Sequence, residues 1–155
     1  MEPDYKIVLS RAMSLCSKSE KTVYDIRQSM SRWGMTDKEK QNKIIDYLKE
    51  NSFIDESRYS YSYVRDKHKF NRWGRVKIRA MLRAKGLTDS IIDQAVNSIS
   101  QEEYIKTLKD DISGRRKRLK AKNQYDLRAK LMRFAQSRGY ETDLSYKIVD
   151  EIINS

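Results

Sequence analysis

Few residues in this chain favour tight turns. One proline, Pro3, and five glycines occur in 155 residues. An all-β fold needs many tight turns, and those turns depend on these two residue types. Their scarcity argues against a β-rich architecture and makes α-helices the default expectation.

Long apolar runs are absent as well. No stretch of about 18 apolar residues, the length that crosses a membrane as a helix, occurs. The first residues, MEPDYKIVLSR, have neither the basic start nor the apolar stretch of a secretory signal. We therefore expect a cytoplasmic protein with no membrane partner.

Cysteine and histidine occur once each. Cys16 cannot close an intramolecular disulfide, and its helical spacing from Leu9 and Ala12 predicts a buried structural thiol. His68 stands in a basic run with only Asp66 as an adjacent carboxylate, so we expect a surface or phosphate-facing histidine instead of a catalytic one. One cysteine and one distant histidine cannot complete a zinc site.

Other catalytic patterns are missing too. No glycine-rich phosphate loop of the nucleotide-binding kinds is present. The pairs Glu102-Glu103 and Asp110-Asp111 could suggest metal ligands, but adjacent residues on a helix point about 100° apart, which favours a solvated helix face. The sequence predicts no enzyme, no cofactor and no metal site.

The net charge of +11 is concentrated in blocks. Residues 56–86 hold ten basic and two acidic side chains, and residues 106–138 hold twelve basic and three acidic ones. Residues 87–105 and 139–155 are acidic, and residues 1–55 are nearly neutral. Such blocks indicate a polyanion site, whereas a basic face kept for solubility alone normally mixes both signs of charge.

A repeat spaced by about 52 residues runs through the chain. Three segments align on Gly34, Gly86 and Gly139, and each glycine follows an apolar pattern of helical spacing. Glycine just past a helix is the usual residue for a left-handed C-terminal turn. A threonine follows each glycine, and Thr36 with Glu39 predicts a capping box for the next helix.

These signals predict an all-α protein of three tandem three-helix repeats that form an elongated, curved solenoid. The predicted repeats are residues 1–52, 53–100 and 101–155. The predicted helices cover residues 5–15, 20–33, 37–50, 56–70, 74–85, 89–100, 101–122, 125–138 and 143–153. The Tyr59–Tyr63 stretch alternates as a strand would, but without a partner strand nearby we interpret it as helix.

The residues Phe53–Ile92 resemble the central signature of the RecX family of regulatory proteins. The matching features are an apolar-Ile-Asp-acidic start, an Arg-aromatic pair, a Val-Arg step, Gly-x-x-x-Ile, and Leu-x-x-Lys-Gly-aliphatic. Ser60 and Lys77 depart mildly from the family pattern. The match is specific over residues 17–100 and limited to the helical pattern over residues 101–155.

The resemblance implies a bacterial regulator of the RecA recombinase in DNA repair, homologous recombination and the SOS response. Such a protein is expected to act as a monomer, to bind in the groove of RecA filaments on DNA, and to inhibit filament extension, ATP hydrolysis and strand exchange. The expected partners are the RecA filament and single- and double-stranded DNA. The alternative is a free-standing helical DNA-binding or architectural protein.

The candidate filament- or DNA-binding residues combine the basic blocks with nearby aromatic rings. Tyr59 and Tyr63 are expected in the core, whereas Tyr61 and Trp73 lie among arginines and are better candidates for base stacking or a partner surface. The full set is Arg58, Tyr61, Arg65, Lys67, Lys69, Arg72, Trp73, Arg75, Lys77, Arg79, Arg83, Lys85, Arg115, Arg116, Lys117 and Arg118.

Overall fold

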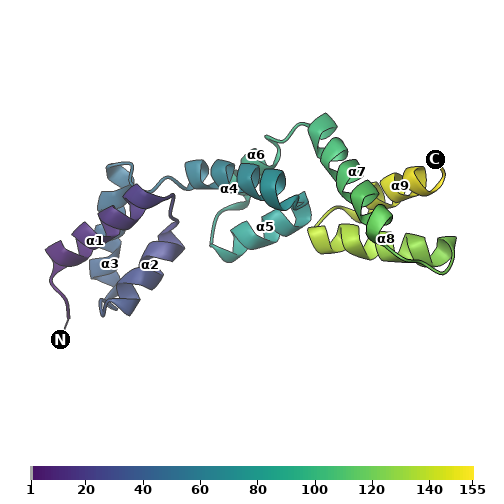
Figure 1. The fold of residues 1–155 in the computed structure, drawn as a ribbon. Coiled ribbons are helices and arrows are strands. Elements are labelled where there is room, and N and C mark those ends of the chain that lie inside the picture. The colour runs from purple at the N-terminus through teal and green to yellow at the C-terminus, as the bar shows by residue number, and fades with distance from the viewer. Residues whose placement is uncertain (1) are drawn as a thin grey trace. The chain divides into compact units, whose positions relative to one another are not determined.

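The computed structural model describes residues 2–155, and every regular element in them is an α-helix (Figure 1). The all-α prediction is confirmed. The helices are α1 (Tyr5–Lys18), α2 (Val23–Arg32), α3 (Lys38–Glu50), α4 (Glu56–Asn71), α5 (Arg75–Ala84), α6 (Asp89–Val96), α7 (Gln101–Arg118), α8 (Gln124–Arg138) and α9 (Thr142–Ile153).

The largest differences from the predicted bounds are at the ends of α6 and α7. We predicted a helix to residue 100, but α6 ends at Val96, where the Ser98 hydroxyl donates to the Ala95 carbonyl. Ser100 then caps α7, because its side chain accepts the backbone N–H of Glu103 at 3.1 Å. We predicted α7 to extend to residue 122, but it ends at Arg118.

The three aligned glycines adopt the predicted left-handed conformation. Their φ angles are 94° at Gly34, 78° at Gly86 and 90° at Gly139. The prediction for the threonines holds only in the middle segment, where Thr88 accepts the backbone N–H of Ile91 at 3.4 Å. In the other segments a neighbouring acidic residue stands at the cap position.

The predicted capping box at Thr36 is wrong. Asp37 caps α3 instead, and its carboxylate accepts the backbone N–H of Glu39 at 3.0 Å. Aspartate and threonine are both good caps, so the pattern fits either position. A capping box does occur at α2, between Thr22 and Asp25.

The chain divides into two compact units. The N-terminal unit comprises the residues up to Ser62 together with Leu82–Ile92, and the C-terminal unit comprises Tyr63–Met81 and Asp93–Ser155. Within the N-terminal unit, α1, α2 and α3 pack on one another. The core of this bundle consists of Val8, Ala12, Ile26, Met30, Met35, Ile44, Ile45, Leu48 and Ile54.

Cys16 lies beside this core and is half-buried, not fully buried as predicted. Burial raises the pKa of its thiol, and the nearby positive charge of Lys21 only partly offsets this effect. The thiolate is the reactive form of cysteine. The structural role predicted for Cys16 therefore agrees with its surroundings.

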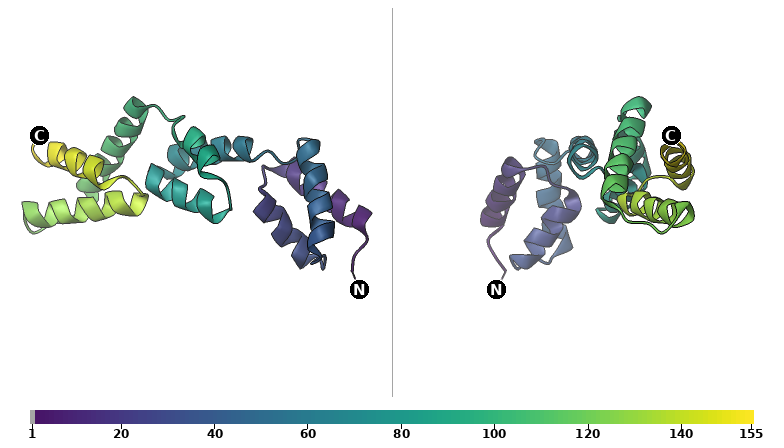
Figure 2. Two further views of the ribbon diagram at one scale, coloured as in Figure 1. Left: turned by 180° about the vertical axis from the view of Figure 1, so that it is seen from behind. Right: turned by 45° about the vertical axis from the view of Figure 1, so that its right-hand side comes forward.

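The C-terminal unit contains the three-helix group α7, α8 and α9, whose packing is visible in both views of Figure 2. Tyr104, Leu108, Ile112, Leu131 and Val149 form part of its buried core. This group meets the α4–α5 turn at a contact that we call the joint, formed by residues 72–76 and 138–141 with Tyr104 and Asp111.

Two backbones touch directly at the joint. The N–H of Gly74 donates to the Arg138 carbonyl at 2.7 Å, and the N–H of Val76 donates to the Gly139 carbonyl at 3.0 Å. A Cβ atom on Gly74 would lie only 2.4 Å from the Gly139 carbonyl oxygen. Only glycine permits an approach this close.

Asp111 forms the ionic part of the joint. Its carboxylate is 3% exposed and accepts hydrogen bonds from Arg138 at 2.9 Å and Arg72 at 3.3 Å. The predicted solvated face at Asp110-Asp111 is therefore wrong for Asp111. A carboxylate this deeply buried needs such partners, because water no longer stabilises its charge.

Three buried rings in contact, of which His68 and Tyr104 are stacked and Tyr140 is tilted, complete the joint. His68 lies 5.3 Å from Tyr104 and Tyr104 lies 5.1 Å from Tyr140, measured between ring centroids. His68 is 4% exposed, and its Nδ1 is 3.0 Å from the Trp73 carbonyl oxygen. The prediction of a surface or phosphate-facing histidine is wrong, because stacking on Tyr104 places the ring inside the C-terminal unit.

From the pKa values of the two buried tyrosines, Tyr104 and Tyr140, we predict that the fold loses stability at alkaline pH. Burial and the hydrogen bond to Glu141 raise the pKa of Tyr104 above its ordinary value of 10.0, and burial and the charge of Asp111 raise that of Tyr140. Above about pH 10 the unfolded chain loses these protons while the folded chain keeps them. Stability should therefore be unaffected below pH 10 and fall above it, by up to about 1.4 kcal/mol per pH unit for each ring.

Chemical unfolding at pH 8 to 11 measures this effect. The double variant Tyr104→Phe/Tyr140→Phe should show a shallower alkaline loss of stability than the parent chain. Tyr125→Phe is the control, because it removes the same hydroxyl from a ring that is 83% exposed. Equal slopes in the parent and the double variant would contradict the assignment.

Candidate functional site

Six of the sixteen predicted site residues form ion pairs with carboxylates. Five of these carboxylates come from outside the basic block 56–86, so the block exposes less unbalanced charge than its composition suggests. The pairs are Arg58–Glu20, Arg65–Asp66, Arg72–Asp111, Arg79–Asp93, Arg83–Asp89 and Lys85–Asp25.

Arg75 has a structural position. Its guanidinium lies 4.0 Å from the Tyr104 ring centroid and donates to the Gln101 side chain at 2.9 Å and the Ile99 carbonyl at 3.0 Å. Its backbone N–H donates to the Tyr104 hydroxyl. These contacts hold the Arg75 side chain against the α6–α7 turn.

Arg116 also has a structural contact. Its guanidinium donates to the carbonyl of Ile152, in the last turn of α9. A cation at the C-terminal end of a helix satisfies a carbonyl that has no partner in the helix and interacts favourably with the helix dipole. Arg116 therefore stabilises α9 against α7.

An aromatic ring with two lysines, which we call the Trp73 cluster, lies at the α4–α5 turn. It comprises Tyr63, Lys67, Trp73 and Lys77. The ammonium groups of Lys67 and Lys77 lie 4.9 and 4.5 Å from the Trp73 ring centroid, and Tyr63 meets the indole edge-on at 6.5 Å. Neither lysine has a carboxylate within ion-pair distance among the described residues.

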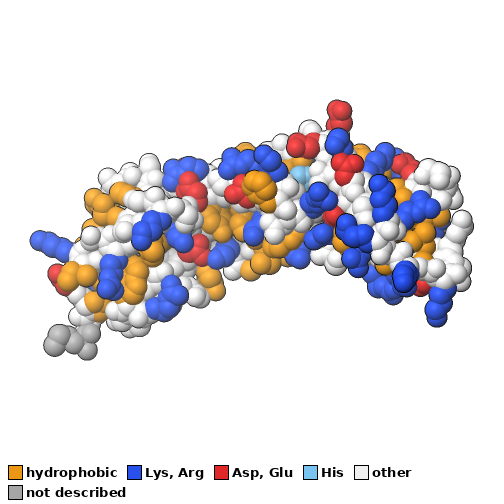
Figure 3. Space-filling model, viewed as in Figure 1, with side chains coloured by type: hydrophobic (Ala, Val, Ile, Leu, Met, Phe, Trp, Pro, Cys, Tyr) orange, Lys and Arg blue, Asp and Glu red, His pale blue; other side chains and the backbone are white. Residues whose placement is uncertain are grey.

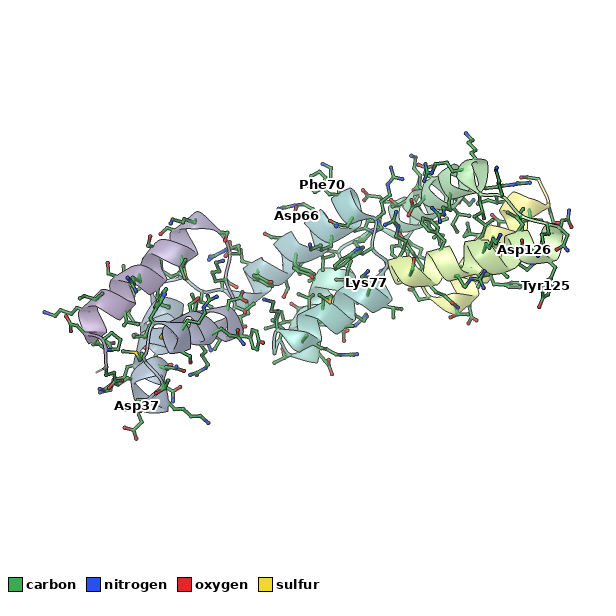
Figure 4. The ribbon with its side chains drawn as sticks, turned by 60° about the horizontal axis from the view of Figure 1, so that its bottom comes forward. Asp37, Asp66, Phe70, Lys77, Tyr125 and Asp126 are labelled. Carbon is green, nitrogen blue, oxygen red and sulfur yellow. The ribbon has the colours of Figure 1, made fainter. Side chains whose placement is uncertain are left out.

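Two further candidates on α4 face solvent. Tyr61 is 41% exposed, as expected for a partner surface, and Lys69 is exposed beside Phe70, which is 72% exposed. Figure 4 shows Asp66 and Phe70 on the same side of α4, pointing away from the helix. Tyr59 and Tyr63 are half-buried, which makes them less buried than the predicted core positions.

The second basic block forms an exposed surface, the α7–α8 patch. Figure 3 shows Lys and Arg side chains gathered over α7 and α8. Its members are exposed, and none has a carboxylate within ion-pair distance among residues 2–155. They are Arg115, Lys117, Arg118, Lys120, Lys122 and Arg133.

The candidate set predicted from the sequence omitted half of this patch. Lys120 and Lys122 continue the same basic run as Lys117 and Arg118, so the run itself was the available signal. Arg133 lies on α8, and only the packing of α8 on α7 places it near the run. Within the patch, Arg115 stacks on Phe134 with 5.3 Å between the guanidinium carbon and the ring centroid.

The described residues contain neither a candidate metal site nor a candidate membrane span. No group of three or more histidine, cysteine, aspartate or glutamate side chains is placed to hold a metal ion in that part of the chain. None of the helices there is both long and apolar enough to span a membrane.

Two models of one protein family match the chain. The model described as RecX, second three-helix domain, matches residues 55–96, and the model described as RecX, third three-helix domain, matches residues 102–149. The two matches include α4 to α6 and most of α7 to α9.

Curated relatives agree with this match. The regulatory protein RecX of Clostridium acetobutylicum is 30% identical over 158 residues, which cover 99% of this chain and 72% of that protein. The RecX protein of Clostridium botulinum strain Eklund 17B is 31% identical, with coverages of 92% and 67%. That of Vibrio parahaemolyticus is 30% identical, with coverages of 88% and 86%.

Two solved structures have the same fold. A crystal structure of regulatory protein RecX matches with a TM-score of 0.86 and 23% identity, over 95% of this chain and 73% of that chain. The crystal structure of RecX from Lactobacillus salivarius matches with a TM-score of 0.81 and 18% identity, over 97% of both chains.

Proposed function

This chain belongs to the RecX family of regulatory proteins, and from this membership we propose that it regulates a RecA recombinase. It binds in the groove of RecA filaments on DNA and inhibits filament extension, ATP hydrolysis and strand exchange. It acts in the cytoplasm, as a monomer and without catalysis of its own. The observation that carries the proposal is the exposed α7–α8 patch, whose members form no ion pair within the described part of the chain.

Electrostatics support this assignment of the patch. A filament on DNA presents a dense array of phosphates, and each lysine or arginine that neutralises a phosphate releases a condensed counterion. Side chains already paired with carboxylates gain less from such contacts, because the pair must first be broken. The unpaired residues of the α7–α8 patch are therefore the favoured phosphate contacts, together with Lys67, Lys69 and Lys77 of the first basic block.

A charge-removal variant tests the patch. Replacing Lys117, Arg118, Lys120 and Lys122 by glutamine removes four charges from solvent-exposed positions and breaks no ion pair of the described residues. The slope of log affinity against log salt should fall by about 3 units if all four contact phosphates. The concentration of the variant that half-inhibits RecA ATP hydrolysis on single-stranded DNA should be roughly tenfold higher, or more, than that of the parent chain.

A matched variant controls for net charge. Lys18, Lys38, Lys43 and Lys49 are also exposed and form no ion pair with another described residue, but they lie in the N-terminal unit. Replacing these four by glutamine should leave inhibition close to that of the parent chain. Equal weakening by both variants would show that net charge matters and that the patch has no special role.

The same measurements address the alternative of a free-standing DNA-binding protein. Such a protein would bind bare DNA and RecA-coated DNA with similar affinity at matched salt, and would lower ATP hydrolysis only by competing for DNA. A regulator of the filament inhibits at well below one molecule per RecA protomer. A requirement for near-equal amounts would reject the proposed function.

A further inference from the structure

Trp73 is flanked by two lysines, and among the described residues no carboxylate lies within ion-pair distance of either one. The distances of Lys67 and Lys77 to the same ring centroid, 4.9 and 4.5 Å, keep the two ammonium groups within roughly one Debye length, which is about 10 Å at 0.1 M salt. Like charges at this separation repel each other. The ammonium group of Lys77 donates a long hydrogen bond, of 3.4 Å, to the Ser137 carbonyl. The pair is therefore electrostatically suited to an anion.

The backbone that presents Trp73 is held in an unfavourable conformation. Arg72 has a φ angle of 58°, in the left-handed region where a residue with a side chain is strained. The ion pair between Arg72 and buried Asp111 holds this turn, and the N–H of Trp73 donates to the Lys67 carbonyl at 3.1 Å. Strained residues that the surrounding structure holds in place are concentrated at functional sites.

The chemistry of the cluster matches an unpaired nucleotide. An indole offers a flat surface on which any base can stack, and flexible lysines can move from the ring to the phosphates on either side. An acidic peptide would use the two ammonium groups but would gain nothing from the indole between them. A base pair in duplex DNA is stacked on both sides and offers no free face.

We propose that the Trp73 cluster binds single-stranded nucleic acid, with one base stacked on Trp73 and neighbouring phosphates on Lys67 and Lys77. This inference rests on the proposed function, because it names the component of a RecA–DNA filament that the α4–α5 turn contacts. In this proposal the α4–α5 turn contacts the nucleic acid of the filament and not the recombinase. The α7–α8 patch, in contrast, has the charges but no indole, whereas Trp73 is half-buried between its lysines.

Tryptophan fluorescence tests the proposal on the full chain without RecA. Trp33 and Trp73 are the only tryptophans, so the variant Trp33→Phe leaves Trp73 as the single reporter. A short oligothymidylate should quench its emission saturably. A duplex of equal charge and poly-glutamate should quench much less, even where they bind.

Two variants separate stacking from charge. Trp73→Leu should weaken binding of the oligothymidylate roughly tenfold or more, because it removes the stacking surface. Lys67→Gln/Lys77→Gln should lower the salt slope by about 1.4 units, the value for two single-strand phosphates. Circular dichroism establishes that both variants are folded, and the lysine pair tests the proposal even if Trp73→Leu unfolds.

Matched controls lie elsewhere on the surface. Tyr125→Leu removes a ring that is 83% exposed, and Lys38→Gln/Lys49→Gln removes two exposed lysines of α3. Neither should change the affinity for the oligothymidylate by more than about twofold, since among the described residues neither site has two ammonium groups over one ring, as Trp73 does.

The outcomes distinguish this proposal from the proposed function. The site would be overturned, even with RecA inhibition intact, if the oligothymidylate caused no quenching and bound the Lys67→Gln/Lys77→Gln variant as tightly as the parent chain. The two lysines would then only cover the indole ring. Equal quenching by poly-glutamate would assign the cluster to an acidic protein partner and also overturn the proposal. Specific quenching by the oligothymidylate without any RecA inhibition would support the site while rejecting the regulatory function.

Discussion

Gly74→Ala should destabilise the C-terminal unit by about 3 kcal/mol or more. The new Cβ would lie 2.4 Å from the Gly139 carbonyl oxygen and 2.6 Å from the Tyr140 backbone nitrogen, and backbone atoms cannot move aside as a flexible side chain can. The two backbone hydrogen bonds of the joint would lengthen or break. Thermal unfolding followed by circular dichroism should show the midpoint lowered by more than 10 °C.

Two other glycines provide graded controls. A Cβ on Gly86 meets nothing within 4 Å, so Gly86→Ala should cost only the left-handed backbone strain, about 1–2 kcal/mol. Gly114 lies inside α7 with its nearest neighbour at 4.0 Å, and Gly114→Ala should stabilise the chain by about 0.5–1 kcal/mol. If all three variants had the same effect, the close approach at Gly74 would not determine stability.

Asp111→Asn should cost about 2 kcal/mol of folding free energy. The substitution keeps the shape of the side chain but removes the charge that two arginines share in a site 3% exposed to solvent. Breaking a buried pair normally costs about 3–5 kcal/mol. Arg72 and Arg138 are 52% and 36% exposed and can return to water, which reduces the expected loss.

Asp110→Asn is the matched control, one residue away. Its carboxylate is 61% exposed and pairs with Lys106 four residues earlier, a surface contact that contributes about 0.3–0.5 kcal/mol. Urea unfolding of both variants at low and high salt measures the difference. If the loss at Asp111 disappeared in high salt, the ion pair would be accessible to solvent and the joint would be misassigned.

The sequence predicted the helical fold because the fold depends on local signals. The aligned glycines end helices through their own backbone freedom, so Gly34, Gly86 and Gly139 could be assigned without knowledge of any tertiary contact. Helix bounds were less certain where several residues can cap, as at Thr36 and Asp37. The division into repeats at residues 1–52, 53–100 and 101–155 stays a prediction.

The candidate site was less predictable, because charge along a sequence does not show which charges are already paired. Arg79 and Asp93 are fourteen residues apart, and Lys85 and Asp25 are sixty apart. No local pattern relates such residues. His68 was misjudged for the same reason, since its basic neighbours in sequence are not the groups that surround its ring, which stacks on Tyr104.

The joint also has a consequence for how the C-terminal unit folds. Gly74 bonds to Arg138, sixty-four positions away in sequence, whereas α7, α8 and α9 are successive helices whose contacts require only short loops to close. Local contacts form early in folding and distant ones late, because a long loop loses more entropy on closing. Interactions absent from the transition state act mainly on the unfolding rate. The joint therefore mainly lowers the unfolding rate of the C-terminal unit and has less effect on its folding rate.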